Sequence, residues 1–193
     1  MNIIQEQLGP LSYLVGTWEG VKGEDVAPSD VKNNLNQPVN SKFRERMQFA
    51  ETGRVDNHEQ TLYGLRYSTT AWRANQDAPF HEELGYWLWD RAKQQVLRCF
   101  MVPRGVTAIA GGTVSPLAKT FKLSAELGSP TYGICSNQYL HDEFKTLRYD
   151  LDITIHGEDS FSYDENTQIM IKGKSDIFQH TDSNTLSKLP SGE

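Results

Sequence analysis

The chain has little cysteine, little positive charge and no long apolar run. Its 193 residues include two cysteines, Cys99 and Cys135, without C-x-x-C spacing, which predicts reduced structural thiols and no disulfide framework. Acidic residues outnumber basic ones by 25 to 19, and the formal net charge of −6 argues against nucleic acid or an anionic membrane as the main partner. No stretch is long enough to span a bilayer, and the first ten residues lack the features of a signal peptide. We therefore expect a cytoplasmic protein.

The short motifs that mark common catalysts are also missing. The sequence has no phosphate-binding loop, no dinucleotide fingerprint, no H-E-x-x-H and no Cys/His cluster with zinc spacing. Ser115, within GGTVSP, lacks the flanking glycines of a nucleophile elbow. Any chemistry would therefore come from a bound cofactor or from one or two polar groups in a cavity.

The sequence does contain a series of short segments in which apolar and polar side chains alternate. In residues 146–157 every second side chain is apolar, and residues 160–173 follow as the expected hairpin partner. In residues 42–51, Glu45 shares a face with three apolar side chains. Many strands, short turns and no sustained helical period predict an all-β fold. We expect one domain over residues 1–193, a single antiparallel barrel of about ten strands of the lipocalin or fatty-acid-binding-protein type.

Some segments do not fit the strand pattern. Residues 22–41 are polar, with two prolines and several asparagines, and predict a long loop. Residues 128–145 have the composition of an insertion or a remodelled strand pair. Residues 181–193 are expected to form a C-terminal tail with a short helical turn. The first strand is expected over residues 11–20, after a lead-in that stops at Gly9-Pro10.

Two motifs carry a resemblance to a known family. GTWEGVK, residues 16–22, would put Trp18 at the closed end of a barrel. PFHEELGYW, residues 79–87, brings His81 and Glu83 onto one face of a strand. In order and approximate spacing, the two motifs resemble nitrobindin, a family of haem-binding β-barrels once described as fatty-acid-binding-protein-like. Lys22 stands where the family has its last glycine.

The resemblance implies a cofactor and a set of residues that contact it. The family holds haem b near the open end of a ten-stranded barrel, and a histidine near the C-terminus ligates the iron. The matching residue here is His180, while His81 matches the pocket histidine on the distal side, and Thr17 is grouped with them as a cofactor contact. Asp182, Asn184 or a backbone carbonyl would fix the tautomer of the ligating ring. The resemblance also implies binding of nitric oxide and conversion of peroxynitrite to nitrate.

Alternatives that use the same barrel stay open at this point. A haem-free barrel would bind a fatty acid or another small apolar ligand. An enzyme would use His81 and Glu83 on a small substrate. The choice also depends on which way the polar strand faces point, because these carry Arg44, Arg46 and Arg148. If they point inward, the interior is wet and basic, which would disfavour haem. Whether the chain forms a homodimer is also left open.

Overall fold

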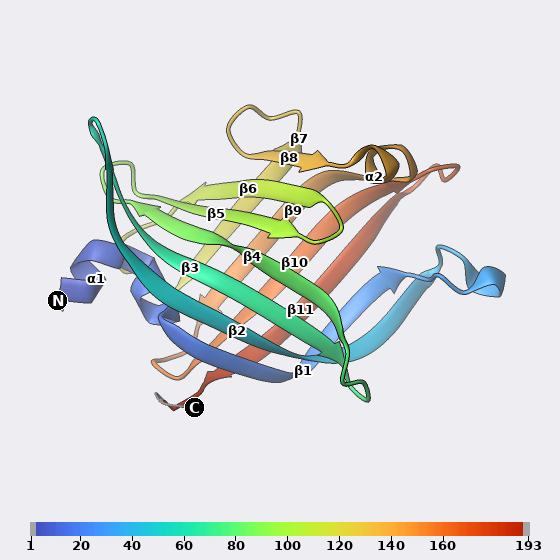
Figure 1. The fold of residues 1–193 in the computed structure, drawn as a ribbon, viewed down its shortest axis with the longest axis horizontal. Coiled ribbons are helices and arrows are strands. Elements are labelled where there is room, and N and C mark those ends of the chain that lie inside the picture. Colours follow the sequence, from blue (N-terminus) through green and yellow to red (C-terminus); the bar gives the residue numbers. More distant parts are fainter. Residues whose placement is uncertain (1–2, 191–193) are drawn as a thin grey trace.

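Residues 3–190, which the computed structural model describes, form a closed β-barrel (Figure 1). The strands are β1 Gly16–Pro28, β2 Pro38–Asn57, β3 Gln60–Arg73, β4 Pro79–Asp90, β5 Gln95–Val102, β6 Val106–Thr113, β7 Thr120–Leu127, β8 Gly133–Ser136, β9 Phe144–Ile155, β10 Ser160–Ile171 and β11 Ile177–Lys188. The helices are α1 Ile3–Leu8, η1 Gly9–Leu14, η2 Lys32–Asn34 and α2 Gln138–Glu143. None of these helices is long and apolar enough to cross a membrane.

The order of strands around the barrel is β1-β11-β10-β9-β7-β8-β6-β5-β4-β3-β2, and β2 closes the ring on β1. This arrangement confirms the all-β barrel that the alternating segments predict. It differs from the expectation in one respect. β8 runs parallel to β7, so the sheet is mixed and not purely antiparallel.

The alternation of side chains decides which residues fill the barrel. The expected hairpin of β9 and β10 is present, with Phe161 opposite Ile155, and the apolar face of β9 is buried. On β2, Glu45 points inward with its apolar neighbours, and Arg46 points outward to pair with Glu19 at 3.0 Å. Arg148 likewise pairs with Asp150 on the outside. The interior is therefore not lined by the arginines of these polar faces.

One end of the barrel is plugged by the segment that precedes β1. Leu11 and Leu14 lie in η1, are fully buried, and close this end together with Trp18. The indole nitrogen of Trp18 donates to the carbonyl of Leu14 at 2.7 Å, and its ring packs edge-on against Phe161. The first strand thus begins at Gly16, not at residue 11, because the apolar side chains before it are used by a 3-10 helix that enters the barrel.

Residues 22–41 do not form the expected long loop. β1 continues to Pro28, β2 starts at Pro38, and only residues 29–37 connect them. Gly23 lets the two strands pack closely, because a Cβ at that position would lie 2.5 Å from the ring of Phe43. Pairing of the backbone across this hairpin, with Val26 opposite Asn40, outweighs the turn-like composition.

The other two irregular segments are also ordered into the barrel. Residues 177–188 form β11, which pairs with both β10 and β1, so most of the expected tail is a strand that closes the ring. The final three residues of that tail lie outside the described residues. Within residues 128–145, β8 pairs with β6 and β7, and α2 follows it.

Candidate functional site

The two ends of the barrel differ in how far their side chains are exposed. At the plugged end, Leu14 and Trp89 have no exposed surface. At the opposite end, the side chains of His81 and His180 are each 33% exposed, and that of Arg73 is 28% exposed. We call this the open end. The two histidines come from β4 and β11, so the structure brings both predicted histidines to the same end of the barrel.

His180 is held by a buried carboxylate. Its Nε2 lies 3.0 Å from Oδ1 of Asp25, which β1 supplies. Oδ2 of Asp25 accepts hydrogen bonds from Arg73 at 2.6 Å and from Ser41 at 3.1 Å. Burial would raise the pKa of Asp25, but the hydrogen bonds and charges of His180 and Arg73 hold it below its usual value. The carboxylate that fixes the His180 ring is therefore Asp25, not Asp182 or Asn184 as expected from the sequence.

His81 and Glu83 lie on one face of β4, as the alternation predicted. His81 Nε2 is 3.2 Å from Oε1 of Glu83. Burial would lower the pKa of His81, but its hydrogen bond to Glu83 and the charges of Glu83 and Glu165 raise it. The ring is therefore held in its protonated form toward higher pH than a free histidine.

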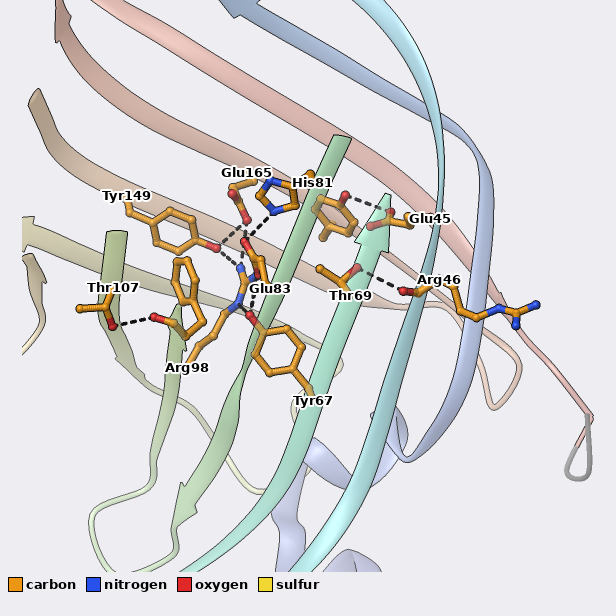
Figure 2. A network of polar contacts seen from close by, with 12 residues as sticks. Glu45, Arg46, Tyr67, Thr69, His81, Glu83, Arg98, Thr107, Tyr149 and Glu165 are labelled. Carbon is orange, nitrogen blue, oxygen red and sulfur yellow. Dashed lines mark hydrogen bonds and ion pairs between the residues drawn. The ribbon is translucent and has the colours of Figure 1, made fainter. Parts of the chain in front are cut away.

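Beneath the histidines, a buried arginine is clamped by two tyrosine–glutamate pairs (Figure 2). Arg98 Nη2 donates to Glu83 at 2.6 Å, and its Nη1 donates to Glu165 at 2.9 Å. Tyr67 donates to Glu83 and Tyr149 donates to Glu165, each at 2.6 Å, and both hydroxyls also accept from Arg98. These five residues are called the charged floor below.

The charged floor is balanced in charge when His81 is protonated. Burial would raise the pKa of Glu83, but Arg98, His81 and Tyr67 hold it well below its usual range, so this carboxyl stays ionised. Two carboxylates then face one guanidinium and one imidazolium. Because each buried charge has a partner, the cluster avoids the large cost of an isolated ion inside the barrel.

A second group of acids lies near the floor, on β2 and β11. Glu45 accepts hydrogen bonds from Tyr163 at 3.0 Å and from Asn184 at 2.8 Å. Burial raises the pKa of Glu45 to about 7, with the charges of Glu165 and Glu83 adding to the effect. Burial and four neighbouring carboxyls also raise the pKa of Asp182 well above its usual value. Within residues 3–190, no group of His, Cys, Asp or Glu is arranged to hold a bare metal ion.

The structure does not bring Thr17 to this site. It is on β1, opposite Gln48, and points to the outside of the barrel beside the inward Trp18. Its backbone carbonyl accepts from the amide of Leu189 at the plugged end. Thr17 is therefore separated from His81 and His180 by most of the length of the barrel.

Arg98 and Glu165, which join β5 and β10 to the site, were not predicted from the sequence. A usable signal was present, because Arg98 falls at the inward position between the buried Val96 and Phe100. A charged residue at an inward position of an apolar strand predicts a buried ion pair, since an unpaired charge there would be too costly.

This barrel is similar to known proteins in fold and in sequence. The crystal structure of Rv2717c from M. tuberculosis is similar in fold, with a TM-score of 0.67 over 98% of this chain and 99% of that chain, at 19% sequence identity. Two proteins called peroxynitrite isomerase, from Clavibacter sepedonicus and Clavibacter michiganensis subsp. michiganensis (strain NCPPB 382), are each 35% identical over 83 residues. The match spans 42% of this chain and about a third, 35%, of the length of each relative. The model of the THAP4-like, heme-binding beta-barrel domain matches residues 7–188, and the chain therefore belongs to this family.

Proposed function

We propose that this protein binds haem at the open end of the barrel, with His180 as the iron ligand and His81 on the other side of the haem. The observation that carries the proposal is the pair of inward histidines at the open end, each 33% exposed. Each is hydrogen-bonded to a buried carboxylate, Asp25 for His180 and Glu83 for His81. Family membership supports the same cofactor.

The chemistry of these side chains fits a haem. Imidazole is a common axial ligand of haem iron, and the ring nitrogen that does not ligate takes a hydrogen-bond partner of its own. Ligation through Nε2 requires the His180 ring to leave Asp25, which keeps its bonds to Arg73 and Ser41. Phe43 and Phe80 pack together near this end, with ring centroids 6.1 Å apart, and the guanidinium of Arg73 lies 3.7 Å from the ring centroid of Phe80.

The charged floor limits how far a ligand can enter the barrel from the open end. Arg98 and Glu83 are each only 5% exposed and are bonded to each other, so neither is free to pair with a ligand that enters. A long fatty-acid tail would have to lie against these desolvated charges, which argues against the haem-free lipid barrel. A flat ligand above the floor leaves the network intact.

Residues of the protein would then contact the small ligand that binds to the haem iron. Bound haem iron would supply the position at which nitric oxide or peroxynitrite reacts, and the two curated relatives named peroxynitrite isomerase support this activity. His81, held protonated by Glu83, would donate a hydrogen bond to an anionic ligand. Arg98 and Tyr67 hold Glu83, and through it the ring of His81.

Titration with haemin tests the proposal. Wild-type protein should show a saturable Soret change with one haem per chain, and His180→Ala should lose it because the bond between protein and iron is gone. His81→Ala, the matched control on the facing wall, should still bind haem and change the rate with nitric oxide or peroxynitrite. The proposal fails if the wild type shows no saturable change. If His81→Ala loses haem and His180→Ala keeps it, the roles of the two histidines are reversed.

A further inference from the structure

The turn between β5 and β6 holds Arg104 next to His81 at the open end. β4 and β5 are antiparallel, with Leu84 opposite Met101. Continuing this register by three residues, back along β4 and forward past the end of β5, brings His81 and Arg104 to the same row. The electrostatics agree with this placement, because burial and the nearby charge of Arg104 both act to lower the pKa of His81, and Glu83 outweighs them.

The backbone of this turn is held by its neighbours. Gly105 has a φ of 84°, and its amide donates to the carbonyl of Val102 at 2.9 Å. The side-chain amide of Asn137 donates to the carbonyl of Arg104 at 2.6 Å, and its backbone amide donates to the carbonyl of Gly105 at 2.9 Å. Asn137 also caps α2, because its side chain accepts from the amide of Leu140. The point from which the guanidinium extends is therefore fixed by the surrounding structure.

The guanidinium of Arg104 has no anionic partner in the described chain. Arg104 is exposed and forms no ion pair with residues 3–190. Arg73 and Arg98 differ from it, because they are bound to the carboxylates of Asp25 and Glu83. A guanidinium presents its N–H donors in a flat fork that matches a carboxylate or another planar oxyanion. The fork of Arg104 is therefore available to an anion from solution.

His81 has one ring nitrogen left for the same anion. Its Nε2 lies 3.2 Å from Oε1 of Glu83, and Nδ1 has no hydrogen-bond partner within the part of the chain that the structure describes. In the protonated ring this nitrogen is a donor. An imidazolium and a guanidinium that share a row repel each other. An anion between them would accept from both and replace the repulsion by two attractions.

Charges farther inside the barrel favour the rim as the place for this anion. Asp25 and Glu83 are buried carboxylates whose pKa values lie below their usual range, so both are ionised. A small anion that entered beyond the rim would approach them and be repelled, whereas Arg104 and His81 attract it at the rim. The arrangement therefore favours a small oxyanion that stays beside these two cations.

We propose that Arg104 and Nδ1 of His81 form a binding site at the rim of the open end for a small oxyanion or for the carboxylate of a larger ligand. The two kinds of ligand share one chemistry, a flat group of oxygen atoms with a negative charge, which fits the guanidinium fork. The site consists of residues of this chain alone and does not require haem, so it goes beyond the proposed function.

Titration of the haem-free protein with sodium nitrate tests the site, in chloride-free buffer and followed by NMR signals of the His81 ring and the Arg104 guanidinium. Both signals should shift in a saturable way in the wild type. Arg104→Gln should raise the Kd at least about threefold, because one of two cationic donors is lost, and Arg104→Lys should recover part of the loss because it keeps the charge. Arg66→Gln is the matched control, since Arg66 is an exposed arginine on β3 that forms no ion pair with residues 3–190.

A comparison of haemin with haemin dimethyl ester identifies the source of the charge. If Arg104→Gln weakens binding of haemin but not of the ester, which has no free carboxylates, the anion is a carboxylate of the ligand. If it weakens nitrate alone, the anion is a free oxyanion. The site is overturned if the wild type binds neither probe, if Arg104→Gln binds both as tightly as the wild type, or if Arg66→Gln has an equal effect. A wild type that binds nitrate but no haemin refutes the proposed function and leaves this site standing.

Discussion

Replacing Glu45 by glutamine should change how the stability of the barrel depends on pH. The pKa of this buried carboxyl is raised from 4.5 to about 7, so between these values the folded protein keeps a proton that the unfolded chain gives up. The folded state then binds more protons, and its stability falls as pH rises through this window. The contribution of Glu45 is fully favourable below about pH 4.5 and is lost above about pH 7.

The size of the effect follows from the width of that window. Two and a half pH units at about 1.4 kcal/mol each give a change of about 3 kcal/mol in the free energy of unfolding. Glu45→Gln keeps an oxygen that accepts from Tyr163 and Asn184 but does not ionise. The variant should therefore gain about 3 kcal/mol relative to wild type between about pH 4.5 and pH 8, a relative rise in melting temperature of about 6–12 °C.

Urea unfolding followed by tryptophan fluorescence, at a series of pH values, measures this difference directly. Glu51→Gln is the control, because Glu51 is exposed on the same strand. This variant removes the same charge from the chain but changes no buried group. A difference between Glu45→Gln and wild type that stays constant from pH 4.5 to pH 8 would refute the reasoning.

The remaining predictions concern the charged floor and the plug. Arg98→Met should cost about 3–5 kcal/mol of stability, because Glu83 and Glu165 lose their shared partner inside the barrel. Adding Glu83→Gln should recover part of this loss, and full additivity in denaturant titrations would argue against a shared network. Trp18→Ala should cost about 3–5 kcal/mol, since the ring is 1% exposed and packs on Phe161. A loss below about 1 kcal/mol would contradict its place in the plug.

The parts of the fold that could be predicted are those where one face of a strand is buried and the other is not. β9 shows this most clearly, because its inward side chains are apolar and its outward ones polar along nearly the whole strand. His81 and Glu83 were placed on one face for the same reason. The alternation of inward and outward side chains is a property of a single strand. It can therefore be read from the sequence before the partner strands are known.

The parts that could not be predicted depend on contacts distant in sequence. Nothing near His180 indicates Asp25, which approaches from β1 only because β11 closes the barrel there. The polar stretch after Gly23 has the composition of a loop, but its backbone groups are satisfied by pairing with β2 and β11. In both cases the decisive interaction is pairing between strands, which composition does not encode.

The pairing of β1 with β11 also has a consequence for the order of folding. Trp18 lies opposite Lys188, so the ring closes through a contact between strands that almost the whole chain separates. Until that contact forms, β1 and β11 each present an unpaired edge, which is the state most open to wrong association with another chain. Because Asp25 is on β1 and His180 is on β11, the two side chains meet in the same step that removes those edges. The hydrogen bond between His180 and Asp25 therefore forms only in the closed ring, because it joins β11 to β1.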